Sequence, residues 1–164
     1  MSHLVIRHPE FGDIVVRETD GAITALEWLQ GDEETEPEEP STLLNQARAA
    51  LHVYFATGDL PPGLALNPAG TLYQKRVWAY MQTIPRGETR RYGEVAAAIG
   101  GSPLSVGGAA CANPIPLLIP CHRVVSKSGL GGYCGSDDEG WGLAMKRRLL
   151  VLEGASIRPS RTVR

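Results

Sequence analysis

Apolar residues gather in three short stretches near the start of the chain. Residues 3–8, 13–18 and 22–29 are rich in β-branched and other apolar residues, and Asp20-Gly21 is a typical hairpin turn between the last two. Residues 31–40 form an acidic segment interrupted by proline, which we interpret as a solvated loop. The pattern predicts an antiparallel sheet of three strands.

From residue 41 onward the apolar positions follow the period of a helix. Ser41 or Thr42 can cap this helix, and Gly58 is expected to end it. The apolar positions that share one face are Leu43, Leu44, Ala47, Leu51, Tyr54 and Phe55. Prolines and glycines without apolar periodicity follow up to residue 70, so we place a boundary between two domains there.

The second half of the chain has mainly helical patterns. Capping residues and a proline predict helices that begin after Thr71, after Thr89 and at Pro103, and a last helix spans about residues 142–153. The helices after Thr89 and at Pro103 are short and are joined by Gly100-Gly101. Two short helices with a glycine-containing turn between them predict a helix–turn–helix.

The charge of the chain is distributed unevenly. Residues 1–70 carry three basic and twelve acidic groups, a net charge of −9, whereas residues 71–164 carry thirteen basic and six acidic groups, a net charge of +7. A basic half beside an acidic half favours contact with a polyanion. Two ordinary solvated faces would give the same distribution, so this alternative stays open on charge alone.

Length and composition exclude several classes of protein. The 164 residues are 43 % hydrophobic and 21 % charged, which is sufficient for packed cores and excludes global disorder. The sequence contains no apolar run of about 18 residues, which excludes a membrane-spanning helix. Residues 1–8 lack the pattern of a signal peptide, so we expect a cytoplasmic protein.

The three cysteines do not form a recognisable disulfide or metal pattern. Cys111, Cys121 and Cys134 are an odd number, and no C-x-x-C pair occurs among them. Structural zinc sites normally take four ligands from tight clusters, and the four histidines are scattered. We therefore expect reduced thiols, no metal and no cofactor.

The run Pro120-Cys121-His122-Arg123 is the strongest candidate for chemistry. A cysteine becomes a usable nucleophile when a neighbouring base and cations lower its pKa, and His122 and Arg123 are such neighbours in the sequence. Sequence neighbours need not be spatial neighbours, because adjacent strand residues point to opposite faces. Taken alone, the run therefore favours a structural cysteine.

The wider context changes this interpretation. The chain resembles the O6-alkylguanine-DNA alkyltransferase family, the methylated-DNA–protein-cysteine methyltransferases, most specifically through residues 113–125, NPIPLLIPCHRVV. The resemblance is strong over residues 70–155 and only general before them. Further matches are GTLYQ at residues 70–74, VW at 77–78, IPRGET at 84–89 leading to Tyr92, LL at 149–150 and LEG at 152–154.

The resemblance implies irreversible transfer of an alkyl group from guanine O6 in DNA to Cys121. In the family a histidine assists the nucleophile through water and a glutamate orients the histidine; the matching residues are His122 and Glu153. A tyrosine hydroxyl that stabilises the leaving guanine matches Tyr92, and an asparagine that braces the turn before the active-site loop matches Asn113. Each also fits an ordinary structural position, such as a helix end for Glu153.

The resemblance also implies a base pocket and a DNA-binding surface. The backbone carbonyls of Cys121 and Val124 would recognise the base, and Tyr133 and Cys134 match the loop that covers the pocket. The candidate phosphate contacts are Arg90, Arg91, Lys127, Lys146 and Arg147. The helix–turn–helix would enter the minor groove with small residues that permit close approach or pack the helices, among them Ser102, Gly108 and Ala109.

The sequence departs from the family pattern in several places. Leu104 stands where the family usually has an arginine that fills the space left by the flipped base; Leu104 could act as an apolar wedge, or Arg90 or Arg91 could reach in. Arg91 and Cys134 stand where serine is common. Residues 136–141 form an insertion with three acidic groups, which could weaken DNA binding or change the substrate range.

We therefore expect an α/β (α+β) chain with a ribonuclease-H-like sheet domain at residues 1–69. Residues 70–157 are expected to form a winged-helix-like domain that carries the helix–turn–helix and Cys121, and residues 158–164 a tail. The expected protein is a monomer that repairs alkylated guanine in double-stranded DNA, in a single turnover and without a cofactor. The alternatives are a non-enzymatic damage-binding protein of the alkyltransferase-like kind and a transcription regulator.

Overall fold

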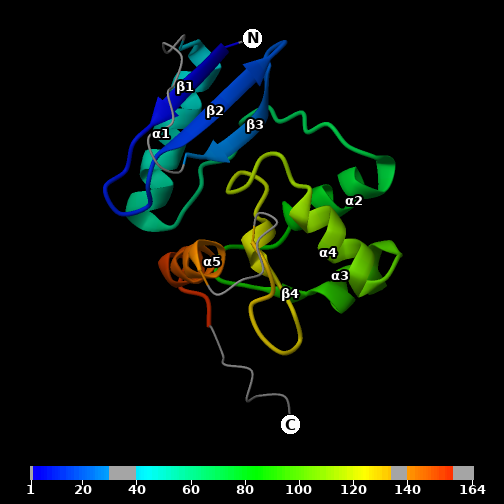
Figure 1. Ribbon diagram of the computed structural model, residues 1–164. Coiled ribbons are helices and arrows are strands. Elements are labelled where there is room, and N and C mark those ends of the chain that lie inside the picture. The colour runs from blue at the N-terminus through cyan, green and yellow to red at the C-terminus, as the bar shows by residue number, and fades with distance from the viewer. Residues whose placement is uncertain (1, 30–39, 134–139, 157–164) are drawn as a thin grey trace. The chain divides into compact units, whose positions relative to one another are not determined.

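The computed structural model describes residues 2–29, 40–133 and 140–156, and the chain divides into two compact units, residues 1–69 and residues 70–164. Figure 1 shows a sheet with one helix in the first unit and several short helices in the second. The prediction of an α+β chain with an antiparallel sheet at its start is confirmed. Within the described ranges, no helix is long and apolar enough to cross a membrane.

The first unit contains the predicted three-stranded sheet. Strands β1 (Ser2–Ile6), β2 (Ile14–Thr19) and β3 (Ala22–Trp28) pair antiparallel in the order β1-β2-β3. Asp20 and Gly21 have φ angles of 51° and 79°, the left-handed conformation that a two-residue hairpin loop requires. The Asp-Gly signal in the sequence therefore predicts this turn correctly.

Helix α1 (Thr42–Thr57) packs on this sheet. Of the two candidate caps, Ser41 is the one used: its hydroxyl accepts a hydrogen bond from the backbone N–H of Leu44 at 3.0 Å. Leu43 is only half-buried, and the rest of the predicted apolar face is buried: Leu44, Ala47, Leu51, Tyr54 and Phe55.

Helices α2 (Leu72–Met81), α4 (Pro103–Cys111) and α5 (Trp141–Leu152) of the second unit begin close to where the sequence predicts. The hydroxyl of Thr71 accepts a hydrogen bond from the N–H of Gln74 at 3.1 Å, and Pro103 occupies the first turn of α4. The indole Nε1 of Trp78 donates to the carbonyl of Ala109 at 2.8 Å. This buried bond ties α2 to α4.

Helix α3 (Tyr92–Ile99) begins later than the predicted cap at Thr89. Arg90 and Arg91 instead form a short strand, β4 (Arg90–Arg91), which pairs in parallel with β5 (Val124–Val125). The backbone of Arg91 is extended, and its N–H donates to the carboxylate of Glu94 at 2.8 Å. The long-range pairing overrides the local capping signal and places Tyr92 beside the segment that follows Cys121.

The turn between α3 and α4 depends on glycine. Gly100 and Gly101 have φ angles of 97° and 92°, which side-chain-bearing residues rarely adopt. A Cβ atom at Gly101 would collide with the hydroxyls of Tyr73 and Ser105, which hydrogen-bond each other at 3.0 Å. The helix–turn–helix arrangement predicted from the sequence is thus present, with α2 braced against its turn.

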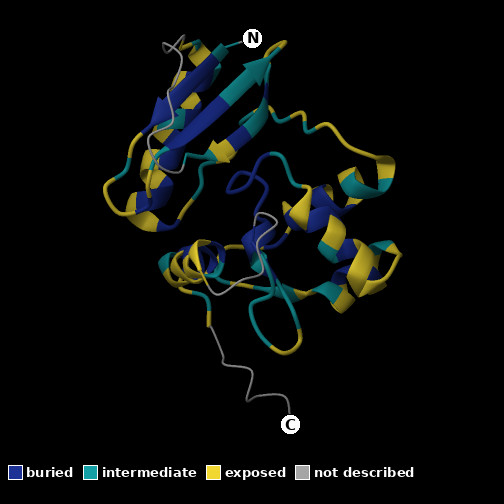
Figure 2. Cartoon of the chain, in the orientation of Figure 1, coloured by how far each residue is buried: buried dark blue, intermediate teal, exposed yellow. Residues whose placement is uncertain are grey.

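The loop between α4 and the next element forms much of the interior of the second unit. Residues 115–120 are all buried, and Figure 2 shows this stretch in the buried colour. Leu117 has a φ of 72°, which is strained for a residue with a branched side chain. The loop leads directly into η1 (Cys121–Arg123), a single turn of 3-10 helix.

Candidate active site

Cys121 is the first residue of η1, and only 5 % of it is exposed. Burial raises the pKa of its thiol, while the Asn113 side chain and the charge of Lys146 act in the opposite direction. Desolvation is the largest effect, and neither His122 nor Arg123, the neighbours of Cys121 in the sequence, is among the causes of the shift. A thiol of this kind needs a base to take its proton before it can act as a nucleophile.

His122 and Glu153 form a buried pair behind Cys121. Nε2 of His122 lies 2.6 Å from Oε2 of Glu153, and both side chains are completely buried. Burial lowers the pKa of His122, and the Glu153 carboxylate opposes that shift. Nδ1 of His122 has no hydrogen-bond partner among the described residues. The imidazole therefore has one nitrogen oriented by a carboxylate and one available to accept a proton.

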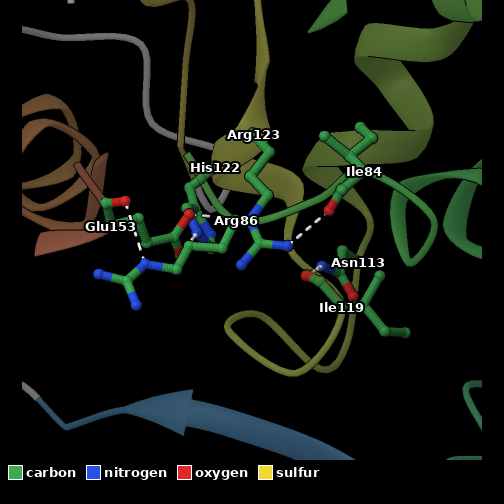
Figure 3. A network of polar contacts seen from close by, with 7 residues as sticks. All are labelled: Ile84, Arg86, Asn113, Ile119, His122, Arg123 and Glu153. Atoms are coloured by element: carbon green, nitrogen blue, oxygen red, sulfur yellow. Dashed lines mark hydrogen bonds and ion pairs between the residues drawn. The ribbon is translucent and has the colours of Figure 1, made fainter. Parts of the chain in front are cut away.

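Glu153 is held by arginines from two other segments, as Figure 3 shows. Nε of Arg123 donates to Oε1 of Glu153 at 2.8 Å, and Nη1 of Arg123 donates to the carbonyl of Ile84 at 2.6 Å. Nε of Arg86 donates to the backbone carbonyl of Glu153 at 3.1 Å. The C-terminal end of α5 is thereby fixed against η1 and against the turn that follows α2.

Asn113 braces the loop that precedes the cysteine. Its Nδ2 donates to the carbonyl of Ile119 at 2.9 Å, and its Oδ1 accepts from the N–H of Ile115 at 2.9 Å. One amide thus closes both ends of the buried loop, and it also acts on the Cys121 thiol. This position fits the expected bracing role.

Tyr92 lies at the start of α3, beside a glycine-rich segment. Burial, together with the Cys121 charge, raises the pKa of Tyr92 to about 12, so its hydroxyl stays protonated and can donate near neutral pH. Gly131 has a φ of 76°, and a Cβ atom built on it would lie 2.7 Å from the Tyr92 hydroxyl. Glycine at this position allows the segment to lie against the phenol ring.

Lys146 is not the surface cation that the sequence predicts. It is completely buried in α5, and its Nζ donates to the carbonyls of Val124 at 2.7 Å and Gly132 at 2.9 Å. Nζ also lies 5.9 Å from the centroid of the Tyr92 ring. A buried cation with these contacts cannot hold phosphate, so its place is inside the site, between the segment after Cys121 and the glycine-rich segment.

The predicted pocket residues can be placed except for Cys134. Val124 is buried and its carbonyl is held by Lys146, and Tyr133 is buried with its ring centroid 6.3 Å from that of Trp141. Cys134 and residues 136–139 of the insertion lie outside the described residues. Cys111 and Cys121 are free thiols, and within the described ranges no three potential metal ligands gather.

Two of the predicted phosphate-binding cations line one groove. Arg91 and Lys127 are exposed and border a cavity of about 250 Å³, together with Glu94 and Ser126. Arg90 is half-buried and pairs with Glu88 at 3.0 Å, and Nη1 of Arg90 donates to the carbonyl of Thr89 at 3.1 Å. Arg90 is therefore less accessible to a ligand than Arg91 or Lys127.

The predicted minor-groove residues divide into exposed and buried positions. Ser102 caps α4, Leu104 is 87 % exposed, and Gly108 is exposed with open space where a Cβ atom would be. The placement of Ala109 on this surface is wrong, because Ala109 is buried and its carbonyl accepts from Trp78. Its small side chain serves the packing of α4 against α2.

Residues 72–155 match the family described as 6-O-methylguanine DNA methyltransferase, DNA binding domain. The chain is 37 % identical over 156 residues to the methylated-DNA–protein-cysteine methyltransferase of Methanothermobacter thermautotrophicus, an alignment that covers 93 % of this chain and 85 % of that protein. The chain belongs to the methylated-DNA–protein-cysteine methyltransferase family. The constitutive methyltransferase of Bacillus subtilis is 34 % identical over 150 residues, covering 85 % of this chain and 90 % of its own length.

Solved structures of methylated-DNA–protein-cysteine methyltransferases have the same fold. Mycobacterium tuberculosis OGT in complex with DNA matches with a TM-score of 0.76 and 36 % identity, over 92 % of each chain. The O6-methylguanine methyltransferase of the same organism matches with a TM-score of 0.78 and 33 % identity, over 99 % of this chain and 98 % of that one. The match therefore extends over both units of the chain.

The sequence does not predict the positions of two residues in this methyltransferase-family site, Lys146 and Arg86. Lys146 is followed by two arginines in an amphipathic helix, a pattern typical of a solvent-exposed face. Arg86 lies in a turn where nothing signals contact with a residue 67 positions later. For Lys146 the available signal is its position on the same helix face as the buried Leu149 and Leu150.

Proposed function

We propose that this chain repairs O6-alkylguanine in DNA by transferring the alkyl group irreversibly to Cys121, in a single turnover. The observation that carries the proposal is the buried Cys121 thiol followed by the fully buried His122–Glu153 pair, joined at 2.6 Å. Family membership, the names of the relatives and the DNA-bound state of one similar structure support it.

The transfer begins with removal of the thiol proton. Nδ1 of His122 has no partner among the described residues and takes the proton from Sγ of Cys121, through a bridging water. The Sγ–carbon bond then forms as the bond between that carbon and O6 breaks. Glu153 holds the other imidazole nitrogen and stabilises the imidazolium during this step.

The guanine that leaves must gain a proton in place of the alkyl group. Tyr92, whose pKa is raised to about 12, donates its hydroxyl proton to a ring nitrogen of the leaving base and regains one from the site. The products are ordinary guanine and an S-alkylcysteine at Cys121. The thiol proton has in effect moved to the guanine, and no oxidant, metal or cofactor takes part.

The lesion reaches Cys121 outside the double helix. Rotating a nucleotide out of the stack costs a few kcal/mol, which DNA contacts must offset. The exposed Leu104 at the start of α4 acts as an apolar wedge, and Arg91 and Lys127, which line one groove, hold phosphates. The carbonyls of Cys121 and Val124 bind the base, with Tyr133 covering it.

The assignment includes the partner and the form of the protein. The chain acts as a monomer on double-stranded DNA that contains alkylated guanine. A damage-binding protein or a transcription regulator would need neither the cysteine nor the oriented imidazole. The presence of Cys121 beside the His122–Glu153 pair favours the enzyme.

Intact-mass measurement tests the proposal. After incubation with duplex DNA containing O6-methylguanine, the protein is expected to gain one methyl group, which peptide mapping places on Cys121. Cys121→Ala should gain none. Cys111→Ala is the matched control, because Cys111 is the exposed free thiol, and it should still gain the group. DNA binding without any gain in mass would contradict the assignment and favour a damage-binding protein.

A further inference from the structure

Within the described residues, the Glu153 carboxylate contacts both His122 and Arg123. Oε2 meets Nε2 of His122 at 2.6 Å, and Oε1 accepts from Nε of Arg123 at 2.8 Å. The His122 and Glu153 side chains are completely buried, and the Arg123 side chain is 11 % exposed. Figure 3 shows the three side chains in one network that draws on η1 and the end of α5.

The charges in this network determine the protonation state of the His122 imidazole. A buried carboxylate requires a cationic partner, and His122 and Arg123, which both contact Glu153 in the described part of the chain, are groups that can supply one. A guanidinium is always charged, whereas an imidazole is charged only when it binds a second proton. Because Arg123 already balances Glu153, a neutral His122 leaves the trio with no net charge.

The remaining charged and titratable groups near His122 act in the same direction as Arg123. Lys146 on α5 and Arg123 on η1 both lower the pKa of His122, burial lowers it further, and only Glu153 raises it. Cys121, on the same turn, is a buried thiol whose own pKa is raised. Arg86 contacts Glu153 through the backbone carbonyl and is not among the groups that act on His122.

Neutrality fixes the tautomer that the proposed reaction needs. With Glu153 as an anionic acceptor, the single imidazole hydrogen lies on Nε2, and Nδ1 keeps its lone pair. Arg123 is itself held in place, because its Nη1 donates to the carbonyl of Ile84 at 2.6 Å. The guanidinium therefore stays on the carboxylate in a fixed orientation.

We propose that Arg123 is a positioning residue that keeps His122 neutral and its Nδ1 unprotonated, because its guanidinium balances the negative charge of Glu153. The effect of Arg123 on the rate of alkyl transfer rests on the proposed function, in which Nδ1 of His122 accepts the Cys121 proton. Without the guanidinium, the buried carboxylate recruits a proton onto His122. An imidazolium has hydrogens on both nitrogens and cannot accept another proton.

Imidazole ¹⁵N chemical shifts of His122 in the full-length protein test the proposal independently of catalysis. In the wild type we expect a neutral Nε2–H tautomer at pH 7. Arg123→Gln keeps an N–H donor but removes the charge, so the His122 titration should move to higher pH. Arg123→Lys keeps the charge and should restore the wild-type titration, and Arg86→Gln, which removes a nearby charge from the backbone side, should leave it in place.

The proposal fails if His122 is already cationic in the wild type at pH 7, a measurement that needs no variant to fold. It also fails if the titration is the same in Arg123→Gln and the wild type. In single-turnover methyl transfer, Arg123→Gln should lose several-fold more rate relative to the wild type at pH 6 than at pH 8, because a raised pKa of His122 leaves less of its neutral form at the lower pH. Absence of transfer in the wild type would contradict the proposed function and leave the ¹⁵N result to decide the role of Arg123.

Discussion

At the scale of single residues, the site depends on how a carboxylate, a guanidinium and an imidazole share one small volume. His122 and Glu153 are completely buried, and Arg123 reaches them from a nearly buried position. Removing one member of such a group leaves the others with uncompensated polarity. Chemistry and stability are therefore linked at these positions, and a useful substitution preserves shape and hydrogen bonding.

Glu153→Gln is such a substitution. The amide is isosteric, but it cannot stabilise an imidazolium as a carboxylate does, so we expect methyl transfer to slow by roughly a hundredfold. Affinity for DNA should change little, because Glu153 is buried behind the cysteine. Rapid-quench transfer and fluorescence anisotropy on the same duplex measure the two quantities. Equal transfer rates in the two proteins would remove Glu153 from the mechanism.

Residue roles divide clearly into those that sequence could predict and those that it could not. Cys121, His122 and Asn113 lie in one short recognisable run, and Tyr92 and Glu153 in the flanking motifs, so their proximity follows from a family resemblance. The burial of Lys146 depends on the carbonyls of Val124 and Gly132, which are distant in sequence. Local pattern contains no information on such contacts.

At the scale of elements, helix α4 has glycines that its own packing does not require. A Cβ atom at Gly107 or Gly108 would meet open space, yet glycine costs about 1 kcal/mol in a helix interior relative to alanine. Gly101, by contrast, is confined by Tyr73 and Ser105. The absence of side chains on the exposed face of α4 therefore fits the close approach of an external surface, which in the proposed function is DNA.

Gly108→Ala separates stability from binding. The variant should be more stable by about 1 kcal/mol, because alanine favours the helix and meets no neighbour. It should also bind DNA more weakly, because the added methyl group lies on the exposed face of α4. Chemical denaturation and anisotropy titration give the two values. Stabilisation with undiminished DNA affinity would show that α4 does not approach DNA closely at this position.

Leu104 offers a second test of α4. Its side chain is 87 % exposed at the start of the helix, where an apolar group gains nothing from the protein itself. Leu104→Arg introduces a charge that phosphates attract and should strengthen binding or speed base flipping. Leu104→Ala is the control and should weaken both if the side chain acts as a wedge. Identical behaviour of all three proteins would assign the wedge to another residue.

The sequence predicts the ends of helices and strands correctly where a local signal determines them. Thr71, Pro103 and the Asp20-Gly21 turn act through their own backbone preferences, and the structure follows them. The predicted cap at Thr89 fails because Arg90 and Arg91 are drawn into a ladder with Val124 and Val125. A pairing across more than thirty positions cannot be seen in a local pattern.

At the scale of the whole molecule, the distribution of charge predicts how salt affects binding. The half of the chain from residue 71 onward carries a net charge of +7, and the half before it −9. Lys127 is exposed and shares a groove with Arg91, so it is the cation that we expect to displace a counterion from DNA.

Lys127→Ala should weaken DNA binding and reduce the slope of log K against log salt by about one. Arg7→Ala removes an equal charge from the first unit, where Arg7 pairs with Asp13 at 2.7 Å, and serves as the control. Its salt slope should equal that of the wild type. If both variants alter the slope equally, the effect of Lys127 is one of net charge and not of contact.

The two-residue ladder between β4 and β5 has a consequence for the coordination of recognition and reaction. Arg91 adjoins Tyr92, the first residue of the helix–turn–helix, and Val124 directly follows the turn that carries Cys121. The helix–turn–helix and the cysteine turn are therefore joined by the four paired residues of this ladder. A displacement of α3 would therefore be transmitted through this ladder to the turn that carries Cys121. Moving only the helix–turn–helix into another scaffold would break this linkage, whereas moving it together with residues 121–125 would keep it.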